Sequence, residues 1–307
     1  MLAIVCPGQG SQTPGFLSEW LDVDGVREHL AALSEITGRD LIEHGTLSDE
    51  EQIKDTAVAQ PLIVAAGLIT ARALLGRQLP ENTILAGHSV GEITASALAG
   101  ALSETDAMNF VRVRANAMAQ AAAATPTGMA AVLGGDPQEV LQRLAELGLT
   151  PANANGGGQT VAAGTLEQLA ALGENPPAKA RVIPLKVAGA FHTAHMAGAL
   201  GELAELAATL SPAEPSTTLL SNFDGAPVAS GAANLDSLVA QVSRPVRWDL
   251  CMETLAAQGV TGILELAPAG TLVGLARRGL KGVKTLALKS PADLEAAREF
   301  IAQHTGN

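Results

Sequence analysis

Residues 83–102 read TILAGHSVGEITASALAGAL, and this stretch decides the fold class. The apolar run Thr83–Ala86 predicts a buried strand, and helical spacing resumes from Glu92 to Leu102. Between them, residues 87–91 match the pattern G-x-S-x-G, in which small flanking residues permit a strained turn that lifts the serine hydroxyl above a sheet. The stretch therefore predicts a strand, a sharp turn and a helix, the α/β class, and Ser89 as a candidate nucleophile.

Apolar runs on either side of this stretch extend the same sheet. Leu2–Cys6 is a continuous apolar run stopped by Pro7-Gly8, which is typical of a buried strand followed by a turn. Gly262–Leu266 and Lys284–Leu288 suit two more strands, and helical spacing fills residues 104 to about 123. Strands that alternate with helices in this way favour a mostly parallel sheet.

The pattern changes between residues 126 and 189, where six short elements follow one another. They are a strand at 129–133, a helix at 137–147, strands at 150–155 and 159–163, a helix at 166–172 and a strand at 181–185. This βαββαβ order is that of the ferredoxin-like unit. We therefore predict a large α/β domain made of residues 1–125 and 190–307, with a ferredoxin-like small domain, residues 126–189, inserted into it.

Composition limits the class of protein and its partners. The chain has 307 residues, of which 47% are hydrophobic and 16% charged, so it lies far from the disordered class and can bury a full core. Its formal net charge of −12 repels phosphate backbones and anionic lipid headgroups. Nucleic acid and membranes are therefore not expected as partners.

The cysteines and the N-terminus bear on location. Cys6 and Cys251 are the only cysteines, too few for a disulfide framework, and both lie in apolar surroundings that suit buried thiols. Residues 1–5 lack the basic and long apolar regions of a secretion signal. We expect a cytoplasmic protein.

A serine nucleophile needs a base, normally histidine, within hydrogen-bond reach. His192 follows the last strand of the predicted insert, where the chain returns to the large domain, and such junctions are favoured positions for sites. His195 is its rival, whereas His88 adjoins Ser89 and leaves the turn in another direction, so its expected role is packing or support of the turn. The other histidines fall in segments predicted to lie on the surface: His29, His44 and His304.

The loop PGQGSQ at 7–12 follows the first predicted strand, and its glycines let backbone N–H groups turn toward a ligand. It lacks the nucleotide P-loop pattern, and Gln12 and Thr13 break the dinucleotide fingerprint. An oxyanion hole fits better, with its other N–H supplied by the residue after the nucleophile, Val90. The alternative is a plain turn at the end of a strand.

Two arginines are candidates for holding a charged substrate. Arg112 and Arg114 stand two residues apart on one predicted helix, so they point to different faces. One can reach a pocket while the other stays in solvent, and their spacing alone does not distinguish them.

Seven stretches together, in this order, resemble the malonyl-CoA:acyl carrier protein transacylases of fatty-acid synthesis. They are PGQGSQ (7–12), DTAVAQP (55–61), GHSVGE (87–92), RVRANAM (112–118), NANGGGQ (153–159), GAFHT (189–193) and QVSRPVRW (241–248). The resemblance runs from about residue 4 to residue 289. It implies an α/β-hydrolase-like large domain with a ferredoxin-like insert, which agrees with the elements predicted from the residues.

The resemblance also implies a role for each residue of the site. Ser89 would be the nucleophile, His192 the base and acid, and the backbone amides of Gln9 and Val90 the oxyanion hole. The others would serve the histidine or the substrate: Gln241, whose backbone carbonyl orients His192, Arg114, which clamps the malonyl carboxylate, and Phe191, which is similar to the malonyl-selecting form.

The implied activity is a ping-pong transfer of a malonyl group from malonyl-CoA, through a malonyl-serine ester, to the phosphopantetheine thiol of an acyl carrier protein. No metal and no cofactor of its own are expected, because the carrier brings the phosphopantetheine. Two alternatives stay open: a serine hydrolase or thioesterase of the same fold, and a malonyltransferase that serves a polyketide or malonate-decarboxylase carrier protein.

Acyl carrier proteins are typically acidic, so a chain of net charge −12 needs a local basic patch to dock one. Two stretches free of acidic residues supply candidates: Lys179, Arg181 and Lys186 in the first, and Arg277, Arg278, Lys281 and Lys284 in the second. An alternative for Arg277 and Arg278 is that they only complement the negative end of the predicted helix over 271–278.

Overall fold

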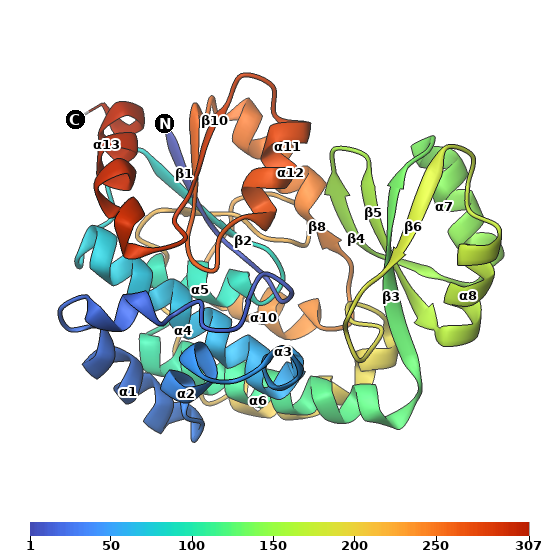
Figure 1. Cartoon of the computed structure of the whole chain (residues 1–307), viewed down its shortest axis with the longest axis horizontal. Coiled ribbons are helices and arrows are strands. Elements are labelled where there is room, and N and C mark those ends of the chain that lie inside the picture. The colour runs from blue at the N-terminus through green and yellow to red at the C-terminus, as the bar shows by residue number, and fades with distance from the viewer. Residues whose placement is uncertain (307) are drawn as a thin grey trace.

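The computed structural model describes residues 1–306 and contains two five-stranded sheets side by side (Figure 1). The first sheet has the order β10-β9-β1-β2-β7, and every neighbouring pair in it is parallel. Its strands are β1 (Leu2–Cys6), β2 (Thr83–Gly87), β7 (Thr218–Leu219), β9 (Gly262–Glu265) and β10 (Lys284–Ala287). The predicted parallel sheet is confirmed, and β7 is a short strand that the sequence analysis did not identify.

Helices cover both faces of this sheet. The α-helices are α1 (Val26–Thr37), α2 (Leu41–Thr46), α3 (Glu50–Lys54), α4 (Thr56–Leu75), α5 (Gly91–Leu98), α6 (Glu104–Ala124), α9 (Leu200–Ala207), α10 (Gly231–Gln241), α11 (Trp248–Ala257), α12 (Thr271–Gly279) and α13 (Leu294–Thr305). The structure around the first sheet also contains three 3-10 helices: η1 (Glu19–Asp22), η2 (Ala194–Ala199) and η3 (Pro291–Asp293).

Strand β1 shows why its residues form a central strand. All five of its side chains are buried, and they alternate between two cores. Leu2, Ile4 and Cys6 join the larger core with α4 and α6, whereas Ala3 and Val5 join the smaller core with α11 and α12. A continuous apolar run is required here because both faces of the strand are covered.

The helix α4 runs through the larger core and packs against α6. It is the one described helix that is long and apolar enough to cross a membrane, but 83% of its most apolar window is buried inside the protein. Its apolar surface is therefore accounted for by core packing.

The second sheet has the order β6-β3-β5-β4-β8. Its elements from the predicted insert are β3 (Thr127–Gly134), α7 (Pro137–Glu146), β4 (Thr150–Gly156), β5 (Gln159–Thr165), α8 (Leu166–Glu174) and β6 (Ala180–Pro184). These four strands pair antiparallel in the ferredoxin-like order, and α7 and α8 cover one face. The predicted βαββαβ unit is confirmed, whereas the boundaries at 125/126 and 189/190 stay a prediction.

The fifth strand of the second sheet comes from outside the predicted insert. β8 (Val246–Arg247) pairs parallel with β4, so Asn153 lies opposite Val246 and Ala154 opposite Arg247. The sequence analysis did not predict this strand. Two residues after Pro245 are too short a run to show a periodic pattern.

The turn between β2 and α5 depends on two glycines. A Cβ atom on Gly87 would lie 2.1 Å from the Gly91 backbone, and one on Gly91 would lie 2.2 Å from the Cys6 backbone oxygen. Any side chain at either position would separate α5 from β1 and β2.

We therefore predict that Gly91→Ala lowers the free energy of unfolding by about 1–3 kcal/mol or more, because backbone atoms must move to admit the methyl group. The matched control is Gly201→Ala in α9, where no heavy atom lies within 4 Å of the new Cβ. It should be neutral or gain about 0.5–1 kcal/mol from helix propensity. Urea unfolding followed by circular dichroism measures both, and equal stabilities would contradict the steric argument.

Candidate active site

Ser89 occupies the turn between β2 and α5, and its φ of +54° is in the left-handed region that few non-glycine residues adopt. Its backbone N–H donates to Asn222 Oδ1 at 2.7 Å. The Asn222 side-chain amide in turn donates to the Gly87 carbonyl at 2.6 Å. Asn222 is thus hydrogen-bonded to two residues of the turn, Gly87 and Ser89, and holds the strained backbone of Ser89 in place.

The structure brings His192, and not His195, to the serine. Ser89 Oγ lies 2.7 Å from His192 Nε2, and His192 Nδ1 lies 2.8 Å from the Gln241 backbone carbonyl. Because a carbonyl only accepts, Nδ1 carries the proton and Nε2 is free to accept one from the serine hydroxyl. His195 is exposed in η2. The predicted trio of Ser89, His192 and the Gln241 carbonyl is therefore assembled, with a carbonyl in the place of a triad carboxylate.

The backbone of His192 is also in the left-handed region, with a φ of +63°. Its N–H donates to the Val242 carbonyl at 3.0 Å, next to the carbonyl that holds its ring. Burial, and after it the positive charge of Arg114, lower the pKa of His192 to about 3. The imidazole is therefore neutral, and ready to accept a proton, throughout the physiological pH range.

Arg114 lies on α6 with 1% of its surface exposed, and its guanidinium reaches the serine. Nη1 donates to Gln60 Oε1 at 2.7 Å, and Nη2 donates to Gln241 Oε1 at 2.9 Å and lies 3.5 Å from Ser89 Oγ. Burial lowers the pKa of Arg114 to about 10, so it stays charged. Two neutral amides hold the cation, which leaves its charge available to a substrate carboxylate.

Arg112, the other candidate, is half-buried on a different face of α6 and donates to Asn109 at 3.5 Å. The structure thus separates two arginines that their spacing alone could not. Phe191, beside the histidine, is buried in the larger core.

The loop at residues 7–12, which contains Gln9, lies against the turn at residues 87–91. A Cβ atom on Gly8 would lie only 2.7 Å from the His88 carbonyl oxygen. The Gln9 side-chain amide donates to Thr56 Oγ1 at 3.3 Å and to the Lys54 carbonyl at 3.5 Å. Over residues 1–306, the backbone N–H groups of Gln9 and Val90 donate to no protein acceptor. Both N–H groups are therefore unused by the fold, as an oxyanion hole requires.

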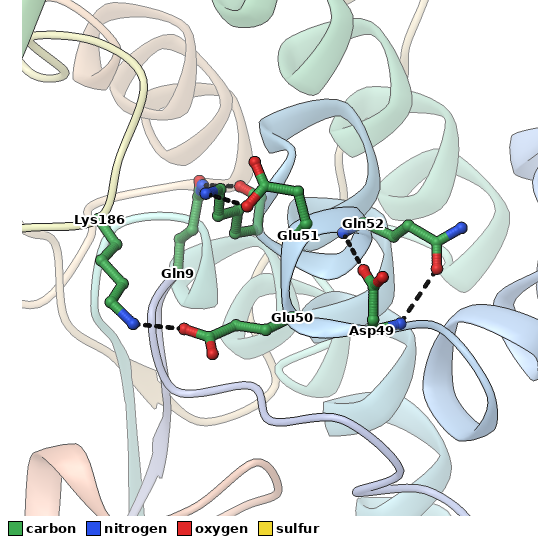
Figure 2. A network of polar contacts seen from close by, with 7 residues as sticks. Gln9, Asp49, Glu50, Glu51, Gln52 and Lys186 are labelled. Atoms are coloured by element: carbon green, nitrogen blue, oxygen red, sulfur yellow. Dashed lines mark hydrogen bonds and ion pairs between the residues drawn. The ribbon is translucent and has the colours of Figure 1, made fainter.

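A cleft of about 840 Å³ is lined in part by Lys54 and Thr56, the two residues to which the Gln9 side chain donates. It is bounded by α3, the start of α4, the end of α6 and the linker 186–188 that leads from β6 to His192. Lys186, on its rim, pairs with Glu50 of α3 at 2.6 Å (Figure 2). An exposed ion pair of this kind contributes little to stability, but it brings the linker and α3 together at the cleft.

Four residues of the site were missed by the sequence analysis as functional residues: Gln60, Glu92, Asn155 and Asn222. The first three lie in stretches that carried the family resemblance, which was the available signal. Asn155 Oδ1 pairs with His88 Nε2 at 2.9 Å and joins the serine turn to β4, so His88 has the supporting role predicted for it. Asn222 lies three residues after the unpredicted strand β7, and neither a periodic pattern nor a family stretch in the sequence pointed to it.

The prediction that His304 lies on the surface is wrong. The side chain is only 8% exposed and packs against Phe300, with Nδ1 2.8 Å from Thr261 Oγ1. A residue near the chain end is buried here because α13 docks on the sheet. Across the described part of the chain, no three His, Cys, Asp or Glu side chains form a group that could hold a metal ion. The expected absence of a metal stays a prediction.

Comparison with known proteins assigns the family. The profile of the family described as "Acyl transferase domain" matches residues 3–298. The malonyl CoA-acyl carrier protein transacylase of Mycobacterium tuberculosis (strain H37Rv) is 54% identical over 297 residues, 96% of this chain and 98% of that protein. This chain belongs to the malonyl-CoA:acyl carrier protein transacylases of the acyl transferase family.

Solved structures agree with the family. The crystal structure of the M. tuberculosis protein shares 53% identity, covers 97% of this chain and 99% of its own, and superposes with a TM-score of 0.94. A malonyl-transacylase solved in complex with a type II polyketide acyl carrier protein shares 30% identity, covers 97% and 99%, and superposes with a TM-score of 0.91. The predicted family and fold class are confirmed.

For this family member we predict that Arg114→Ala lowers kcat/KM for malonyl-CoA by at least about 100-fold and affects acetyl-CoA far less, because only the malonyl group carries a carboxylate. Arg114→Lys should recover part of the activity, since an ammonium cannot reproduce the planar fork. Arg112→Ala is the matched control and should keep the preference. Equal losses for both donors in Arg114→Ala would show that the guanidinium is structural.

Proposed function

We infer that the protein transfers a malonyl group from malonyl-CoA to the phosphopantetheine thiol of an acyl carrier protein. Membership of the transacylase family supports the activity. The observation that carries the chemistry is that one buried site holds a serine bonded to a neutral histidine and, 3.5 Å from the serine oxygen, a buried cation. A nucleophile beside a carboxylate-binding charge is suited to a malonyl thioester.

In the first half-reaction, Ser89 Oγ attacks the thioester carbonyl while its proton passes to His192 Nε2. The oxyanion of the tetrahedral intermediate is stabilised by the N–H groups of Gln9 and Val90. Collapse breaks the C–S bond, and His192 returns the proton to the CoA sulfur. The products are free CoA and a malonyl ester on Ser89, whose distal carboxylate pairs with Arg114.

The second half-reaction reverses these steps with a different thiol. The carrier's phosphopantetheine thiol gives its proton to His192, and the sulfur attacks the ester carbonyl. The C–O bond to Ser89 then breaks, and the serine oxygen takes the proton back from His192. The two half-reactions consume only the two substrates and return Ser89 and His192 to their starting states, so we propose that the protein has no resident cofactor and no metal.

The pathway and location are part of the proposal. The relatives are named as malonyl CoA-acyl carrier protein transacylases, and we propose that the carrier serves fatty-acid synthesis. A polyketide carrier is the second candidate, since one structural neighbour is a transacylase bound to a polyketide carrier protein. The alternative of a serine hydrolase or thioesterase is not supported by these relatives. Cytoplasmic location fits two buried free thiols.

We propose that the carrier docks on a basic surface patch made of Lys179 and Arg181 at the start of β6 in the second sheet and of Arg277, Arg278, Lys281 and Lys284 from the end of α12 to the start of β10, all of them exposed. The β4–β5 turn supports this grouping. A Cβ on Gly157 would lie 3.0 Å from Arg278 Cβ, and the Gly158 carbonyl accepts from the Gly134 N–H, beside Lys179. Residues about 100 positions apart in the chain thus meet at one end of the second sheet.

Lys186, which was grouped with Lys179 and Arg181 on sequence, lies apart from them. Lys179 precedes β6 and Lys186 follows it, so they lie at opposite ends of that strand. Lys186 also pairs with Glu50, whose carboxylate offsets its charge. We therefore assign Lys186 to the rim of the cleft and not to the proposed docking surface.

Arg277 and Arg278 lie in the last turn of α12, so the alternative that they only complement the negative end of this helix stays open.

We predict that brief exposure to malonyl-CoA adds one malonyl group to Ser89 and none to Ser89→Ala, because the ester forms on the activated hydroxyl. His192→Ala should acylate about 10²–10⁴-fold more slowly, the usual effect of losing a general base. Intact-mass spectrometry after rapid quenching measures both, with His195→Ala as the control that keeps the wild-type rate. A label on Ser89→Ala would refute the assignment of the nucleophile.

For docking we predict that Lys179→Glu/Arg181→Glu and Lys281→Glu/Lys284→Glu raise the KM for the carrier and leave acylation of Ser89 unchanged, because the patch touches only the second substrate. The control with the same charge change is Arg27→Glu/Arg77→Glu, at exposed positions in α1 and just after α4. Steady-state kinetics at two ionic strengths report the effect. An unchanged carrier KM in both patch variants would place docking elsewhere.

A further inference from the structure

Glu92, in the first turn of α5, is a carboxylate with no exposed surface that the transfer steps above do not use. Its two oxygens contact two different segments of the site. Oε1 accepts the backbone N–H of Asn222 at 3.1 Å, and Oε2 accepts from the side-chain amide of Gln241. A buried ionisable group is costly unless it has a structural or functional partner, so this arrangement needs a reason.

We propose that Glu92 is a positioning residue whose two carboxylate oxygens hold Asn222 and Gln241, and through them set the geometry of Ser89, His192 and Arg114. The inference rests on the site roles proposed above. It adds to the reaction a residue that touches neither the substrate nor the reacting atoms.

The first arm of this arrangement reaches the nucleophile. Glu92 Oε1 holds the backbone of Asn222, whose side chain accepts the Ser89 N–H at 2.7 Å and donates to the Gly87 carbonyl at 2.6 Å. Ser89 has a left-handed backbone that local sterics do not favour. The Asn222 bonds therefore fix the direction of the hydroxyl, and Glu92 fixes Asn222.

The second arm reaches the base and the cation. The Gln241 side chain has a donor end and an acceptor end, and Glu92 can only accept, so the amide oxygen is turned to Arg114 Nη2 at 2.9 Å. The same residue presents its backbone carbonyl to His192 Nδ1 at 2.8 Å. If the amide turned over, its NH₂ group would face the guanidinium, donor against donor.

A carboxylate is the group that fits both arms. A glutamine in this place would replace one of the two oxygens by an NH₂ donor, and a protonated acid would carry an O–H donor on one of them, although each position already faces a donor. The other titratable groups that face Glu92 are the Arg114 guanidinium from α6 and the Cys251 thiol from α11. Burial raises the pKa of Cys251, which stays a neutral thiol, so Arg114 is the one charge that faces the carboxylate.

The same geometry gives the site a pH dependence that His192 does not supply. Burial raises the pKa of Glu92 to about 7, although hydrogen bonds from Asn222 and Gln241 and the charge of Arg114 act in the opposite direction. Below that pH the acid carries an O–H donor, and one of the two arms is lost. His192, with a pKa of about 3, does not titrate in this range.

The test compares Glu92→Gln with Glu265→Gln, a control in which an equally buried carboxylate that caps α12 through three backbone N–H groups is replaced. Rapid-quench acylation of Ser89 by malonyl-CoA and by acetyl-CoA is measured across about pH 5.5–8.5 and normalised to folded protein. We expect Glu92→Gln to acylate about 10- to 100-fold more slowly, with a reduced malonyl preference. The control should keep the wild-type rate and preference.

The pH profile separates positioning from mere stability. The wild-type rate should fall as the pH drops through about 7, and that fall should be missing in Glu92→Gln, which cannot titrate. A wild-type rate, preference and profile in Glu92→Gln would overturn the inference. If that variant does not fold, a wild-type rate that is constant between about pH 6 and 8 would overturn it. A label on Ser89→Ala would instead refute the site roles and is scored separately.

Discussion

The site depends on one steric constraint: the backbone must pass from β2 into α5 so closely over β1 that only glycine fits at positions 87 and 91. In the turn that these two glycines permit, Ser89 has a left-handed conformation, and its hydroxyl lies at the carboxyl end of the parallel sheet. In open parallel sheets that edge is where sites form, because helix starts and strand ends meet there. The loop after β1, Asn222 three residues after β7, and the start of α5 all reach the serine from this edge.

The second constraint is the buried positive charge of Arg114 beside His192, and the site accommodates this charge without a triad carboxylate. Arg114 is buried among amides, and its charge is one cause of the low pKa of His192. A carboxylate bonded to the histidine would raise its proton affinity and would also draw the guanidinium away from the substrate. A backbone carbonyl orients the imidazole while adding no net charge. The negative group that is present, Glu92, contacts the histidine only through Gln241.

The parts of this arrangement that the sequence predicted are those with a local signal. The turn pattern around Ser89, the apolar run of β1 and the βαββαβ order of residues 126–189 each need only nearby residues. Asn222 could not be found because β7 has two residues and pairs with a strand more than 130 positions away. Pairings between distant surface side chains, such as Lys186 with Glu50, leave no local pattern either. The choice between Arg112 and Arg114 needed the packing of α6.

The pairing of β8 with β4 has a consequence for how this architecture can change. The second sheet takes its edge strand from the segment just after Gln241, the residue that holds the histidine and the arginine. Besides its two chain connections, the small unit is therefore held to the rest of the protein by this strand pairing and by the Asn155–His88 hydrogen bond, so residues 126–189 cannot be exchanged independently. A recombinant in which this unit is replaced by that of a distant relative would also need the relative's segment that corresponds to 246–247. Without it, the pairing of β8 with the foreign β4 would be mismatched close to the active site.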